Sequence, residues 1–84
     1  MSHPRYTSEE IERRGQALYD QQIRTTVESA NKGKFLVLDI DTGEYELDVD
    51  ELAALRRAKA KHPDAALYIL RVGYPTAYRV GDAA

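Results

Sequence analysis

Hydrophobic and polar positions follow their clearest pattern between Gly33 and Leu55, GKFLVLDIDTGEYELDVDELAAL. This pattern predicts a strand, a turn, a second strand and the start of a helix. The run from Lys34 to Ile40 has the length and apolar density of a strand. Asp41-Thr42-Gly43 suits a three-residue hairpin loop in which the glycine takes the left-handed conformation.

The length of this loop fixes which residues pair across the hairpin. Pairing outward from the loop places Leu38 opposite Glu46 and Val37 opposite Leu47. Since side chains alternate between the faces of a strand, one face is expected to carry Phe35, Val37, Tyr45 and Leu47. The other face is expected to carry Leu36, Leu38 and Ile40 beside Glu44, Glu46 and Asp48. The first strand is therefore apolar on both faces.

An N-terminal helix is predicted to begin at Thr7, whose hydroxyl can cap the helix while Glu10 reaches back to the cap. Its apolar positions form a broken stripe of Ile11, Leu18, Tyr19, Ile23 and Val27. We therefore expect it to dock over only part of its length and to leave a protruding half. It ends either near Arg24 or near Ser29, because the β-branched residues between them are poor helix formers.

A second helix is predicted from about Val49 to Lys61, with Asp48 as the cap of a capping box and Asp50 as the rival cap. Leu52 and Leu55 share one side of it, and we expect that side to face the sheet.

The third strand is predicted from Ala65 to Tyr74, with Leu67 and Ile69 on one face and Tyr68, Leu70, Val72 and Tyr74 on the other. A right-handed strand, helix, strand crossover makes this strand parallel to the second and favours the sheet order 2-1-3. The fold class is therefore α+β: an N-terminal helix, then β-β-α-β, with a small, mainly antiparallel sheet and helices on its faces. Ala77 to Val80 is a candidate for a short fourth strand.

Composition narrows the function classes. The chain has 84 residues, so we expect a single domain, 1–84, with frayed residues at 1–6 and 81–84. Its formal net charge is −2, so we expect no general affinity for nucleic acid. It has no cysteine and two histidines, which argues against a disulfide framework or a zinc site. We expect no cofactor. No signal peptide or bilayer-spanning run is present in the sequence, which predicts a cytoplasmic protein without membrane contact.

The two-faced first strand is the main functional clue. One helix covers one face, and the other face must be covered either by the N-terminal helix or by a partner chain. We identify as interface candidates Leu36, Leu38 and Ile40 for apolar contact, with Arg71, Tyr74, Tyr78 and Arg79 at the rim. A homodimer is compatible with either kind of cover.

Three stretches of the sequence allow a chemical role beside an ordinary structural one. Asp41-Thr42-Gly43 matches the catalytic tripeptide of retroviral-type aspartyl proteases, but Asp-x-Gly is also common turn chemistry and Glu44 departs from the motif. The acids from Asp39 to Glu51 do not have the spacing of a calcium loop, although they suit a docking surface for a basic partner. The basic and aromatic residues of the C-terminal region suit either base stacking or a protein interface.

The segments NKGKFLVLD, YELDVDELAALRR and LYILRVG, in the region from Lys32 to Gly73, resemble a family of very small bacterial and archaeal proteins of unknown function. The resemblance is to proteins encoded near aspartyl-protease-like or toxin–antitoxin genes, and it supplies no catalytic residues. It leads us to expect a non-enzymatic protein-interaction module, either an antitoxin-like partner or a homodimer. The alternative is a nucleic-acid-binding transcriptional regulator, and the remote alternative is an aspartyl hydrolase using Asp41.

Overall fold

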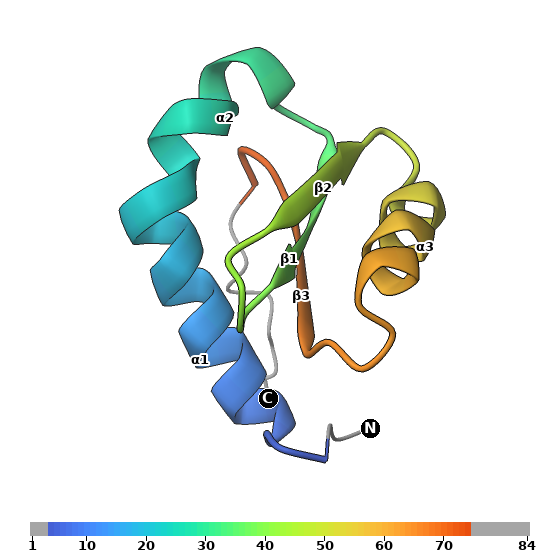
Figure 1. Cartoon of the computed structure of the whole chain (residues 1–84). Coiled ribbons are helices and arrows are strands. Elements are labelled where there is room, and N and C mark those ends of the chain that lie inside the picture. Colours follow the sequence, from blue (N-terminus) through green and yellow to red (C-terminus); the bar gives the residue numbers. More distant parts are fainter. Residues whose placement is uncertain (1–3, 75–84) are drawn as a thin grey trace, which may run out of the picture.

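A computed structural model describes residues 4–74 as a sheet held between two helical layers (Figure 1). The first layer is one continuous helical segment made of α1 (Ser8–Leu18), the π-helical turn η1 (Tyr19–Ile23) and α2 (Arg24–Asn31). The sheet contains β1 (Phe35–Asp39), β2 (Tyr45–Asp48) and β3 (Leu67–Arg71). Helix α3 (Glu51–Lys61) lies on the opposite side of the sheet from α1. The α+β class is confirmed.

The start of the first helix is where the sequence predicts it. The Thr7 hydroxyl accepts from the Glu10 amide at 3.1 Å, and the Glu10 carboxylate accepts from the Thr7 amide at 2.9 Å. The helical segment continues past both expected ends to Asn31. It does not protrude, because Tyr19, Ile23 and Val27 are all buried against the sheet.

The π-helical turn explains how the segment docks along its whole length. Ile11, Gly15, Tyr19, Ile23 and Val27 recur every four residues, and all are buried or partly buried. A step of four residues in a regular α-helix overshoots a full turn by about 40°, so this stripe would wind off the sheet. In η1 a backbone hydrogen bond to the Tyr19 carbonyl spans five residues. The wider turn brings the stripe back toward the sheet.

The sheet has the predicted order β2-β1-β3, and both pairs of neighbours are antiparallel. The central strand β1 is buried on both faces, with Leu36 and Leu38 facing the α1 layer and Val37 facing α3. Strand β3 also divides as expected: Tyr68 and Leu70 join the α1 side, and Leu67 and Ile69 join the α3 side.

The predicted hairpin register is wrong by one residue. Leu38 pairs with Tyr45 and Val37 with Glu46, because the loop comprises four residues, 40–43, between a closing pair at Asp39 and Glu44. The loop glycine does take the left-handed conformation, with φ of 82°. A shift of one residue exchanges the two faces of a strand. Tyr45 and Leu47 therefore join the α1 side, and the acidic side chains of β2 face α3.

Helix α3 is also placed differently from the expectation. Its cap is the rival residue Asp50, whose carboxylate accepts from the Leu52 amide at 3.1 Å. The side that meets the sheet is centred on Ala54 and Ala58, with Leu55 at its flank. Leu52 is 51% exposed. Starting the helix at Glu51 turns Leu52 toward solvent.

The ends of the chain were only partly described by the structure. Ala77 to Val80, the candidate fourth strand, lies outside the described residues, as do 1–3 and 81–84. Within residues 1–6, which we expected to fray, Arg5 and Tyr6 both contact the Asp41 carboxylate. In the described part of the chain, no helix is long and apolar enough to cross a membrane.

Candidate protein-interaction surface

The apolar interface candidates on β1 belong to the core. Leu36 and Leu38 have no exposed surface, and the buried residues above them, Tyr19, Ile23 and Val27, come from the chain's own helical segment. Ile40 is half-buried and contacts the same cluster. The sequence left open whether this face of β1 is covered by the N-terminal helix or by a partner chain, and in the structure the N-terminal helix covers it. These three residues are not an open interface in this conformation.

Arg71 and Tyr74, the rim candidates that the structure describes, do come together at the surface. The Arg71 guanidinium lies 4.3 Å from the centre of the Tyr74 ring and 5.5 Å from that of Phe35. Its Nε donates to the Gly33 carbonyl at 3.1 Å, which fixes the guanidinium between the two rings. Tyr78 and Arg79 lie outside the described residues.

Two exposed apolar side chains that the sequence reasoning missed lie at the same end of the sheet. Val49 is 74% exposed and Leu52 is 51% exposed. Strand β2 ends at Asp48, directly opposite Phe35, and this brings Val49 to the end of the sheet where Arg71 pairs with Phe35. The signal in the sequence for this exposure was Asp50 as the cap of α3. A helix that begins after Asp50 leaves Val49 and Leu52 facing solvent.

We name this region the end patch and define it by five residues: Phe35, Val49, Leu52, Arg71 and Tyr74. Its composition is aromatic, aliphatic and arginine, the combination that dominates binding energy at protein interfaces. A guanidinium already stacked and hydrogen-bonded loses little conformational freedom on binding, so more of its contact energy is retained.

One outer edge of the sheet, that of β3, is open within the described chain. Val72 donates to Lys34 and Ala66 accepts from Ile40, so the even-numbered residues of this strand bond to β1. The backbone groups of Leu67 and Ile69 therefore point away from β1. Among residues 4–74, no backbone hydrogen bond joins those groups to another segment. Nor do residues 67–70 carry the charges or proline with which natural edges are protected.

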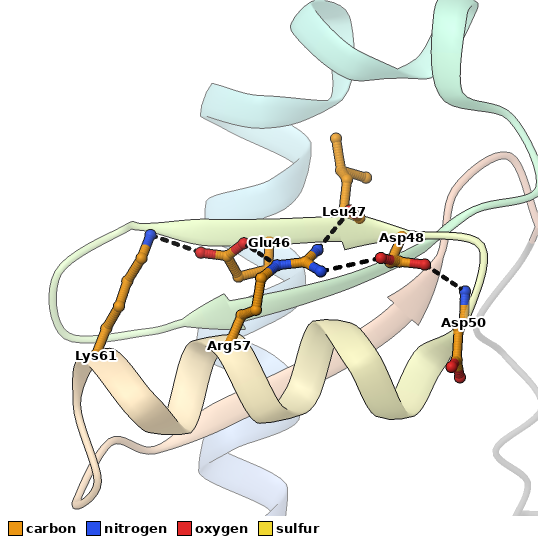
Figure 2. A network of polar contacts seen from close by, with 6 residues as sticks. All are labelled: Glu46, Leu47, Asp48, Asp50, Arg57 and Lys61. Carbon is orange, nitrogen blue, oxygen red and sulfur yellow. Dashed lines mark hydrogen bonds and ion pairs between the residues drawn. The ribbon is translucent and has the colours of Figure 1, made fainter.

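The opposite edge, that of β2, is protected by a network of ion pairs from α3 (Figure 2). Arg57 donates to the Glu46 and Asp48 carboxylates at 2.9 and 3.0 Å and to the Leu47 carbonyl at 2.9 Å. That carbonyl faces away from β1, because the neighbouring residues of β2 are the ones that bond to it. Lys61 adds a second contact to Glu46 at 2.5 Å.

The network also shifts the acidity of its members. Hydrogen bonds from Lys61 and then Arg57 lower the pKa of Glu46. The Asp50 amide, followed by Arg57, lowers the pKa of Asp48. The same contacts raise the pKa of Arg57 and Lys61. These carboxylates are therefore held charged, and they serve the hairpin and α3 instead of standing free as an acidic docking surface.

The candidate catalytic aspartate occupies an ordinary turn. Asp41 is exposed, pairs with Arg5 at 2.8 Å and accepts from the Tyr6 hydroxyl at 2.6 Å, and this last bond is the main reason that the pKa of Tyr6 is raised. Asp39 is buried, and its Oδ1 accepts from the amides of Asp41 and Thr42. These contacts stabilise the hairpin loop.

No metal site emerges from the described residues either. Within residues 4–74, no group of three or more histidine or acidic side chains is arranged to hold a metal ion.

Comparisons with protein-family models, with curated proteins and with solved structures found no match to this chain. The resemblance to very small bacterial and archaeal proteins therefore stays a prediction.

Proposed function

We propose that this chain is a small non-enzymatic protein-interaction module that binds through the end patch. The observation that carries this proposal is Arg71, held against Phe35 and the exposed Tyr74 at the end of the sheet where β2 leads through the exposed Val49 and Leu52 into α3. Large apolar side chains exposed together on a small domain are typical of binding surfaces. An antitoxin-like partner and a self-associating protein both fit this function.

The location of the end patch supports the same function. The two faces of β1 are already covered by the chain's own helices, so a partner does not need to complete the core. It can bind the folded domain from outside, which favours a reversible partner over an obligate one. The described residues of the patch include one cation, Arg71, whereas nucleic-acid surfaces gather several cations along the phosphate backbone.

The test is affinity capture from the source organism with the wild-type chain and the variant Leu52→Glu. The control is Ala60→Glu, which adds the same charge to an exposed position of α3 outside the end patch. Wild type and the control are expected to recover the same protein, and Leu52→Glu is expected to recover at least tenfold less of it. Recovery that is equal for all three chains would contradict the proposal.

Self-association needs a separate measurement. If the partner is a second copy, light scattering of the wild type should give twice the chain mass and Leu52→Glu should give the monomer mass. A dimer that survives Leu52→Glu would place the contact away from the end patch.

A further inference from the structure

The open edge of β3 continues from the end patch through Arg71, and this inference rests on the proposed function. We propose that the edge takes up one extended strand from a partner protein, a segment of about seven residues that is apolar in the middle and acidic at both ends. The strand pairs with β3 and extends the sheet by one strand.

Backbone geometry supplies the first part of the argument. Leu67 and Ile69 present donors and acceptors on the outer side of β3, with no partner for them in the described structure. Helix α3 lies over β1 and β2 and leaves β3 at the side of its cover. The side chains of Leu67 and Ile69 are consequently only partly buried, at the margin of the cluster formed by Val37, Ala54 and Ala58. An added strand can place apolar side chains against this strip.

Charge supplies the second part. Arg71 stands at the end of β3, and its guanidinium has no carboxylate partner among residues 4–74. Lys59 lies just before β3 and has no ion pair in the described structure; it lines a shallow groove with Arg5, Asp64 and Ala65. From Ala65 to Arg71 a strand extends about 20 Å, so acidic residues at the ends of a seven-residue strand would meet the two cations.

A single strand fits this edge better than a second copy of the chain. Helix α1 lies directly against β3 at Gly15, where an added Cβ would come within 2.5 Å of Tyr68. Symmetric pairing of β3 with β3 would bring two such helices about one strand spacing apart, roughly 5 Å. Packed helices need about 8–10 Å between their axes. A peptide strand carries no helix and avoids this clash.

The test is a titration of the full chain with the peptide acetyl-Glu-Val-Thr-Val-Thr-Val-Glu-amide. The backbone amides of the chain are monitored by nuclear magnetic resonance. We expect saturable shifts at Leu67, Ile69 and Arg71, together with slower hydrogen exchange at Leu67 and Ile69. The same peptide with N-methylated valines should bind at least tenfold more weakly. No saturable shift, or shifts confined to other elements, would overturn the proposal.

Two variants separate strand pairing from nonspecific adhesion. Ile69→Pro removes an outward-facing donor and leaves the bonds to β1 in place, so the domain should keep its spectrum and lose peptide binding at least tenfold. Lys59→Glu should weaken binding several-fold and should favour a peptide with lysines at its ends. Unchanged binding by both variants would refute the inference.

Exchange in the free protein distinguishes the other occupants. If the amides of Leu67 and Ile69 are already as protected as those of Tyr68 and Leu70, the edge is taken by residues 75–84 or by a second copy, and the proposal of a partner strand is overturned. If the peptide does not bind but Leu52→Glu still loses the captured protein, the strand proposal fails and the proposed function stands. If the peptide does not bind and Leu52→Glu captures as much protein as wild type, both the strand proposal and the proposed function are overturned.

Discussion

Gly15 allows the contact between α1 and the sheet to be tested with one methyl group. A Cβ at this position would lie 2.5 Å from the Cβ and Cδ2 atoms of Tyr68. Favourable carbon contacts lie at about 3.5–4.0 Å, so the helix or the ring must move by about 1 Å. The ring cannot simply swing away, because its hydroxyl donates to the Gln16 carboxamide at 2.6 Å and the clash includes its first side-chain atom.

Two opposing effects decide the outcome for Gly15→Ala. Alanine favours the helix over glycine by about 1 kcal/mol. Overfilling a close contact costs about 1–3 kcal/mol, and the rigid position of Tyr68 places this site toward the upper end. We therefore expect a net loss of about 1–2 kcal/mol in the free energy of unfolding. For a domain of this size that corresponds to a melting temperature roughly 5–15 °C lower.

The assay is urea unfolding followed by far-ultraviolet circular dichroism. Ala17→Gly, at an exposed position of the same helix, measures the propensity term by itself and should cost about 1 kcal/mol. If Gly15→Ala were as stable as wild type or more stable, propensity would outweigh the contact. The close approach of α1 to β3, and with it the steric argument against β3 pairing with β3, would then be refuted.

Further predictions concern buried polar groups and the ion-pair network. Within residues 4–74 the buried Tyr19 hydroxyl has no hydrogen-bond partner, whereas that of Tyr68 is bonded. Tyr19→Phe should therefore raise the free energy of unfolding by about 1 kcal/mol, and Tyr68→Phe should lower it by a similar amount. Denaturation midpoints in the reverse order would contradict this. Arg57→Gln should lower the urea midpoint at pH 7, while Arg56→Gln, at an exposed neighbouring position, should not. Because the folded pKa of Glu46 is lowered, its contribution is complete above its ordinary pKa of about 4 and is lost as the pH falls through the folded value. The difference between wild type and Arg57→Gln should therefore narrow as the pH falls below the ordinary pKa of Glu46, down to what the bond to the Leu47 carbonyl contributes. A difference that stays the same in acid would show that the network does not act through charge.

Local signals along the chain predicted several elements correctly. The Thr7 and Glu10 pair marks the first helix start, and Gly43 marks the left-handed residue of the hairpin. Both depend on hydrogen bonds or backbone angles within a few residues, so neighbours in the chain determine them. The crossover rule then supplied the strand order, since a right-handed connection leaves few alternatives for so short a chain.

The candidate site was less predictable, because exposure depends on distant segments. Leu36 and Leu38 look like an interface in a strand that is apolar on both faces, and they become core when Tyr19, Ile23 and Val27 cover them. That cover requires the π-helical turn, whose effect on the stripe does not show in a regular helical projection.

By itself, the sequence determined the class of fold, the cap of the first helix, the strand order and the residues competent to form a core. The tertiary structure decided the hairpin register, the face of α3 that meets the sheet and the identity of the exposed residues. The physical reason is that a loop of three or four residues and a cap at Asp48 or Asp50 differ little in local energy. Long-range burial decides between such alternatives, and it left Val49 and Leu52 outside with Arg71 and the open edge of β3.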